Sequence, residues 1–116
     1  MIQLVRGFKN ILPPETSVWQ YVENTAKEHF ENFGFREIRP PVREQAELFQ
    51  RSIGEHTDIV EKEMYTFAGS RGTMLTLRPE ATASVVRAYI QHKLYSADPI
   101  CKFYTIGPMF RKERPQ

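Results

Sequence analysis

Apolar residues recur at helical spacing in two parts of the chain and predict two long helices. The first helix should begin between Pro14 and Ser17, because proline is tolerated in a first helical turn, and end before Gly34, which suits the left-handed position after a helix. Its apolar stripe consists of Trp19, Val22, Ala26, Phe30 and Phe33. The second helix should begin at Pro79, with a buried side made of Ala83, Val86, Ile90 and Leu94.

Shorter runs rich in aromatic and β-branched residues predict strands, which cover residues 35–39, 64–67, 73–77 and 102–111. Residues 68–72 include Gly69 and Gly72 and are predicted to form a hairpin loop between the second and third of these strands. The first strand should end at the Pro40–Pro41 pair, because proline cannot donate a ladder hydrogen bond. The Gly107–Pro108 pair predicts a bend or bulge in the last strand.

Residues 44–53 are predicted to form a short amphipathic helix that ends at Gly54, and residues 55–62 a polar loop. Strands that lie between separate helices, with a hairpin among them, favour an α+β fold in which an antiparallel sheet carries helices on one face. A parallel, doubly wound sheet would require regular alternation of strands and helices, and the pattern lacks it.

Composition narrows the class of protein. A chain of 116 residues with 41% hydrophobic and 26% charged residues fits one domain with an apolar core rather than a disordered segment. Its single cysteine, Cys101, excludes a disulfide scaffold and favours a reducing cytoplasm. No apolar run is long enough for a membrane span, and the first residues lack the form of a signal peptide. The net charge of +2 is too small to require a nucleic-acid partner.

Residue types exclude several kinds of site. Cys101 has no metal-ligating partner at a usual spacing, and the histidines at 29, 56 and 92 are scattered, so no metal site is expected. The loop over residues 69–72 lacks the lysine and hydroxyl residue that end a phosphate loop. No serine lies in a nucleophile elbow.

One candidate site is the segment over residues 76–82, which joins a predicted strand to a predicted helix. It brings Arg78, Glu80 and Thr82 to the junction. A carboxylate beside a hydroxyl could bind a primary ammonium group. Alternatively, Glu80 only answers the helix dipole and Thr82 caps the first turn.

The other candidate is the charged segment at the end of the sequence, where Arg111, Lys112 and Arg114 surround Glu113. The rigid fork of an arginine fits phosphate oxygens, and a nearby carboxylate could recognise the exocyclic amine of a nucleotide. The alternative is a solvated charged turn.

Together these segments resemble the catalytic core of class II aminoacyl-tRNA synthetases, and most closely the histidyl-tRNA synthetase family, over essentially the whole chain. Residues 33–41 are similar to part of motif 1 of this class, which we place at about residues 16–42. Residues 104–116 are similar to the first half of motif 2, which we place at about residues 102–116. Further family-specific segments are residues 6–13, 53–67 and 75–82.

The resemblance implies roles for the candidate site residues. Glu80, Ala81 and Thr82 would line the pocket for the α-amino group of histidine, although many family members have glycine at the position of Ala81. Arg111 would be the catalytic residue that contacts the α-phosphate of ATP and the carboxylate side of histidine. Glu113 would face the adenine amine. Magnesium would be expected on the ATP phosphates, with no protein metal site and no tightly bound cofactor.

The reaction that the resemblance implies is histidine–tRNA ligation in the cytoplasm. The histidine carboxylate attacks the α-phosphorus of ATP, pyrophosphate leaves, and histidine then passes to tRNA(His). A homodimer through motif 1 is also implied, with residues 33–42 at its interface. Nothing in these residues matches the rest of motif 2, motif 3 or the anticodon-binding domain. The sequence therefore predicts the amino-terminal part, residues 1–116, of a catalytic domain that is inactive alone.

Two other functions fit the same sequence. A synthetase-like paralogue is the histidine-binding regulatory subunit of ATP phosphoribosyltransferase, which regulates and does not aminoacylate. The presence of both Arg111 and Glu113 favours the enzyme, because a regulator does not need to bind ATP. The remaining alternative is a stand-alone interaction module that uses motif 1 only for self-association.

Overall fold

The structure is a computed structural model that describes the backbone of residues 1–53 and 62–112, and the side chains of these residues except 51–53. The predicted helix end at Gly54, most of the predicted loop and Glu113 lie outside the described residues. The chain forms two compact units, Met1–Phe35 and Arg36–Gln116, and each is described by itself.

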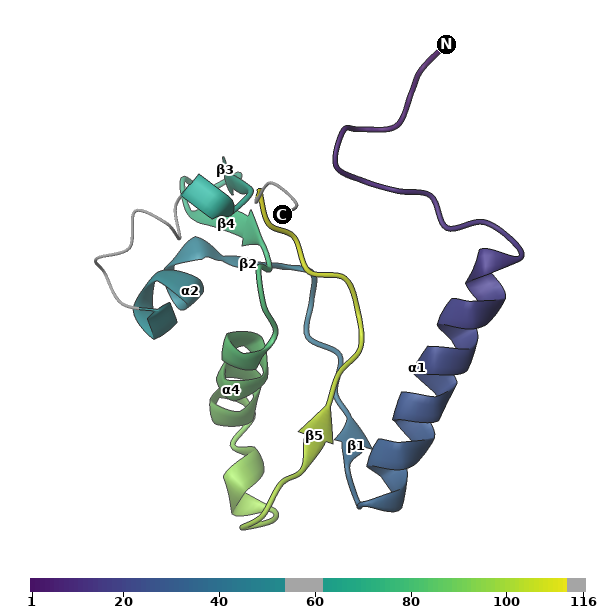
Figure 1. Cartoon of the computed structure of the whole chain (residues 1–116). Coiled ribbons are helices and arrows are strands. Elements are labelled where there is room, and N and C mark those ends of the chain that lie inside the picture. Colours follow the sequence, from purple (N-terminus) through teal and green to yellow (C-terminus); the bar gives the residue numbers. More distant parts are fainter. Residues whose placement is uncertain (54–61, 113–116) are drawn as a thin grey trace. The chain divides into compact units, whose positions relative to one another are not determined.

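The first unit consists of an irregular segment followed by the helix α1, Glu15–Asn32 (Figure 1). Its start and end agree with the sequence prediction. Gly34 has φ +83°, the left-handed conformation expected after a helix. The amide of Gly34 donates to the carbonyl of Glu31 at 3.0 Å, and the amide of Phe35 donates to that of Phe30 at 3.0 Å. These two hydrogen bonds satisfy carbonyls in the last turn of α1.

The apolar stripe of α1 is not buried within its own unit. Among the described residues of that unit, none of the α1 side chains is buried. Trp19 is 49% exposed, Val22 56% and Phe33 62%. Helical periodicity thus predicted the helix correctly, although Phe33 lies just beyond its end, and the irregular segment of residues 1–14 does not cover the stripe.

The second unit contains a three-stranded antiparallel sheet, which confirms the predicted α+β fold with an antiparallel sheet. The strand order is β2 (Arg43–Gln45), β4 (Met74–Leu77) and β3 (Thr66–Ala68). In the predicted hairpin, Ala68 of β3 pairs with Met74 of β4. Gly72 in the connecting loop has φ +76°, which glycine adopts readily.

The helix predicted over residues 44–53 begins later than expected. Glu44 and Gln45 belong to β2, where they pair with Thr76 and Leu75 of β4, and the helix α2 covers Ala46–Ile53. The prediction was wrong here because the partners of these residues lie thirty or more positions away. A local pattern cannot report such pairing.

A second, two-stranded sheet in this unit is parallel. It joins β1 (Arg36–Glu37) to β5 (Phe103–Tyr104). The strand predicted over residues 102–111 is therefore much shorter than expected. Beyond Tyr104 the described chain continues without regular strand structure, and Pro108 cannot donate a ladder hydrogen bond.

The helix α4 covers Thr82–Gln91 and begins three residues after the predicted start at Pro79. Of its predicted buried side, only Ala83 is buried. The buried residues are Ala83, Ser84 and Ala88, whereas Val86 is 50% exposed and Ile90 60% exposed. Small side chains allow α4 to lie close to the core cluster of Ala46, Phe49 and Met64, which Ala83 joins. Leu94, expected in this helix, lies half-buried in the 3-10 helix η1, Leu94–Ser96.

Candidate active site

The predicted site begins at the junction between β4 and α4. Four residues connect the two elements, and they differ in exposure. Arg78 is 4% exposed and Pro79 is also buried, whereas Glu80 and Ala81 are half-buried. Thr82, the first residue of α4, is exposed. The first half of the junction is therefore anchored in the unit, and the second half is accessible.

Glu80 caps the helix that follows it. Both of its carboxylate oxygens lie 3.2 Å from the amide nitrogen of Ala83, which donates to them. This satisfies one of the amides that lack a partner in a first helical turn. The expectation that Thr82 provides the cap is wrong, because Thr82 is already the first residue of α4. A carboxylate has about four lone-pair positions, so Glu80 can cap the helix and still accept a hydrogen bond from a ligand.

Arg111 lies beside this junction. Its Nε donates to the carbonyl of Pro79 at 2.8 Å. The amide of the preceding residue, Phe110, donates to the carbonyl of Arg78 at 2.9 Å. Because Pro79 directly precedes Glu80, the structure brings together two residues that are 31 positions apart in the sequence and that were predicted to belong to one site.

The described part of the charged segment is exposed but contacts the second unit. The amide of Lys112 donates to the carbonyl of Glu63 at 2.8 Å, and its Nζ lies 5.4 Å from the centre of the Tyr65 ring. A lysine ammonium at this distance from an aromatic face is attracted by the ring. Arg111 and Lys112 are both exposed, as the alternative of a solvated turn expects, but each also makes a contact with the second unit.

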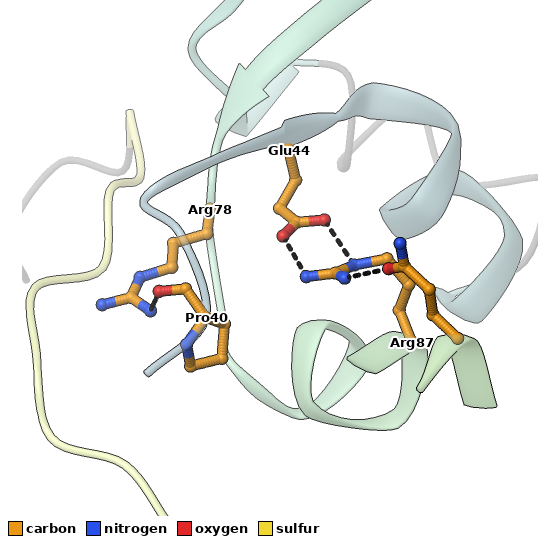
Figure 2. Close-up of polar contacts among 5 residues, drawn as sticks. Pro40, Glu44, Arg78 and Arg87 are labelled. Atoms are coloured by element: carbon orange, nitrogen blue, oxygen red, sulfur yellow. Dashed lines mark hydrogen bonds and ion pairs between the residues drawn. The ribbon is translucent and has the colours of Figure 1, made fainter. Parts of the chain in front are cut away.

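Arg78 is a buried cation whose partners are carbonyl oxygens. Its Nη1 donates to Pro40 at 3.3 Å (Figure 2) and its Nε donates to Pro108 at 3.0 Å. Its amide donates to Val42 at 2.9 Å. Within the described residues no carboxylate forms an ion pair with it. The sequence suggested Arg78 as a site residue, and the structure buries its side chain next to the junction.

A second, half-buried arginine was missed by sequence reasoning. Arg87 of α4 forms a two-pronged ion pair with Glu44 of β2, with Nη2–Oε1 at 2.6 Å and Nε–Oε2 at 2.9 Å (Figure 2). Its Nη1 also donates to Oε1 of Gln91 at 2.8 Å. A sequence signal for its place was helical spacing: Arg87 follows Ala83 by four residues and Ser84 by three, which puts all three on neighbouring positions of α4.

An open depression of about 700 Å³ lies next to this ion pair, and Arg43, Leu48 and His92 are among the residues that line it. None of Glu80, Ala81, Thr82 and Arg111 lines it. In the described part of the chain no group of three acidic, histidine or cysteine side chains could hold a metal ion. Likewise, none of the helices described has the apolar length that a bilayer requires.

Comparison with known proteins gives the class of this fold. The structure of apo histidyl-tRNA synthetase from Staphylococcus aureus matches 96% of this chain and 26% of that one, with a TM-score of 0.80 and 41% identity. A structure from Bacillus halodurans, described as an ATP phosphoribosyltransferase regulatory subunit/histidyl-tRNA synthetase, matches 98% of this chain and 29% of that one, with a TM-score of 0.81 and 19% identity. The fold is that of a class II aminoacyl-tRNA synthetase.

The sequence comparisons are more specific. A family model for histidyl-tRNA synthetase matches residues 7–116. A curated relative, the histidine–tRNA ligase of Desulforapulum autotrophicum, is 68% identical over all 116 residues. The chain belongs to the histidyl-tRNA synthetase family, and it spans 27% of the length of that relative.

Proposed function

We propose that this chain contributes the first part of the histidine-activating site of a histidine–tRNA ligase. The protein would form histidyl-adenylate from histidine and ATP and transfer histidine to tRNA(His). The observation that carries the proposal is the hydrogen bond from Arg111 to Pro79, which joins a candidate phosphate-binding side chain to the Glu80 segment. Residues from two distant segments are then positioned to act on one substrate.

The histidine pocket is assigned to Glu80, Ala81 and Thr82. The half-buried carboxylate of Glu80 and the exposed hydroxyl of Thr82 suit the ammonium group of an amino acid. Ala81 has a small side chain, which leaves room at the junction for a substrate. Capping of α4 by Glu80 supports this role, because the hydrogen bonds to Ala83 restrict the orientation of the carboxylate.

Arg111 is assigned to the α-phosphate of ATP and to the carboxylate of histidine. A guanidinium ion neutralises charge that builds up on a phosphate during attack and holds the two reactants in line. Magnesium would enter with ATP, on the phosphates. Glu113 is assigned to the adenine amine by the resemblance of its segment to motif 2, about residues 102–116.

The protein is expected to act as a homodimer in the cytoplasm. Residues 16–42 include α1, with its exposed apolar stripe, and are similar to motif 1 of class II synthetases. Sedimentation of this chain should show self-association through the stripe. Trp19→Lys should reduce self-association, whereas Tyr21→Lys, at an exposed position outside the stripe, should not. A monomer at high concentration would contradict the dimer.

The regulatory subunit of ATP phosphoribosyltransferase is less well supported. The Bacillus halodurans structure is only 19% identical and speaks for the fold alone. A purely regulatory function also does not explain why Arg111 is hydrogen-bonded to Pro79, next to Glu80.

The test is a chimaera in which residues 1–116 replace the matched residues of the Desulforapulum autotrophicum ligase. Histidine-dependent exchange of pyrophosphate into ATP should be retained. Arg111→Ala should lower the exchange rate by about 10²–10³, the usual effect of removing one group that stabilises transition-state charge. Arg71→Ala, in the exposed hairpin loop, is the matched control and should leave the rate unchanged. A folded chimaera that binds histidine without exchange would overturn the proposal and favour the regulator.

A further inference from the structure

Arg78 connects three segments of the second unit that are far apart in the sequence. Its guanidinium donates to Pro40, in the segment between β1 and β2, and to Pro108, in the segment after β5. Arg78 itself directly follows β4, which ends at Leu77. Figure 2 shows Arg78 and Pro40 in contact across the two segments. A planar guanidinium has donors directed to several sides, so it can join carbonyls that a lysine ammonium could not reach together.

The neighbouring Gly107 leaves the space that this side chain needs. A Cβ built on Gly107 would lie 2.5 Å from Nη2 of Arg78, much closer than non-bonded atoms approach. Gly107 does not have a positive φ, so its backbone conformation does not require glycine. The atom it would meet is the end of the Arg78 side chain, which the hydrogen bonds to Pro40 and Pro108 hold in place, so a side chain at position 107 would have to displace those bonds.

The Arg78 backbone and side chain hold the same stretch that carries Arg111. The side chain binds the carbonyl of Pro108, and the carbonyl of Arg78 accepts from the amide of Phe110. Arg111 then reaches Pro79, the residue directly after Arg78. Four consecutive residues, from Pro108 to Arg111, thus include three that bind Arg78 or Pro79.

We propose that Arg78 is a positioning residue that fixes Arg111 relative to Glu80, and that Gly107 is its required partner. This inference rests on the proposed function for the meaning of the two site residues. Arg78 itself is 4% exposed and would not touch substrate. Its effect on the reaction would pass through the segment of residues 107–111.

Two variants disturb this arrangement from opposite sides. Arg78→Lys keeps the positive charge and removes the fork. Gly107→Ala keeps the fork and adds one methyl group where Nη2 lies. In the double variant the lysine has no Nη2 atom, so Gly107→Ala should disturb the segment less than it does when residue 78 is arginine. Arg71→Lys is the matched control, because Arg71 is exposed in the hairpin loop.

The first measurement is amide hydrogen exchange in the 116-residue chain and its variants. The Phe110 amide should exchange about tenfold faster in Arg78→Lys and in Gly107→Ala, equivalent to about 1.4 kcal/mol. The Gly69 amide, bonded at 2.8 Å to the carbonyl of Thr73 within the hairpin, should be unchanged. Equal acceleration of both amides would mean general destabilisation and would overturn the positioning role.

The second measurement is pyrophosphate exchange by the chimaera carrying the same variants. A loss of folded molecules lowers the apparent kcat and leaves KM unchanged. Misplacement of Arg111 in folded molecules should instead raise the KM for histidine by about tenfold, as expected when one contact of about 1.4 kcal/mol is lost. The increase caused by Gly107→Ala should be smaller in the Arg78→Lys background.

The outcomes separate this inference from the proposed function. A parent chimaera without histidine-dependent exchange would refute the proposed function, whereas the amide measurements would still decide whether Arg78 holds the Phe110 segment. An active parent whose variants keep the KM for histidine would refute the positioning role alone. Additive effects of the two substitutions would refute the assignment of Gly107 as the partner of Arg78.

Discussion

The ion pair between Glu44 and Arg87 leads to a quantitative prediction about stability. The Glu44 side chain is 5% exposed and that of Arg87 is 30% exposed. Arg87→Met keeps a long side chain with good helix propensity and removes the guanidinium. The Glu44 carboxylate would then be left in the interior without its counter-ion. Removing one partner of a buried pair typically costs about 3–5 kcal/mol. Because Arg87 is partly exposed, water can reach part of the site, and we expect a loss near the lower value, about 3 kcal/mol.

The comparison between variants tests the cause of that loss. Glu44→Gln leaves Arg87 able to bond Gln91 and to reach solvent, so it should cost only about 1 kcal/mol. The double variant Glu44→Leu with Arg87→Met removes both charges, and such replacements are often neutral. It should therefore be more stable than Arg87→Met alone, although it carries one more substitution.

Urea unfolding followed by far-ultraviolet circular dichroism measures all three variants. With a slope of about 1–3 kcal/mol per molar urea, a loss of about 3 kcal/mol lowers the midpoint by roughly 1–3 M. The slope should not change, because unfolding exposes nearly the same surface area in each variant as in the unsubstituted chain. A loss below about 1 kcal/mol for Arg87→Met would show that solvent screens the pair as it screens exposed pairs, and would refute the reasoning. A double variant no more stable than the single one would do the same.

Two further predictions concern carboxylates at helix starts. Glu80→Ala should destabilise the second unit by about 1 kcal/mol through loss of the cap on α4, which urea unfolding measures. Glu80→Gln should retain stability and still raise the KM of the chimaera for histidine in pyrophosphate exchange. A KM equal to that of the unsubstituted chimaera would contradict the ammonium role. The hydrogen bond from Lys9 lowers the pKa of Glu15 below its ordinary value, so its contribution to stability is complete above that value and is lost as the pH falls through the folded pKa. Lys9→Ala should return the Glu15 pKa to the ordinary range in an NMR titration. An unchanged pKa would show that Lys9 is not the cause of the lowered value.

The features that sequence predicted correctly depend on local physical chemistry. The bounds of α1 follow from Pro14 at its start and Gly34 at its end, because each residue has its own backbone preference. The hairpin between β3 and β4 follows from a glycine-containing loop between two β-favouring runs. The family followed from several ordered motifs, and Glu80 was selected by its residue type at a strand-to-helix junction.

The features that sequence missed depend on residues far along the chain. Glu44 lies in β2 because β4 offers it a partner, and α4 buries Ala83 and Ala88 rather than Val86 because small side chains permit close packing. A local apolar pattern indicates that a helix has an apolar side, but it does not indicate which neighbour covers that side.

The sequence by itself determined the types of the residues in the candidate site, the helix and turn signals around them, and the family. Only the tertiary structure decided that Arg111 meets Pro79 beside Glu80, because these two residues are 32 positions apart in the sequence. It also decided the surroundings of Arg78, since its bonds to Pro40 and Pro108 form only when three segments are packed together. Residue type fixes what a side chain can bind, and packing fixes what lies within its reach.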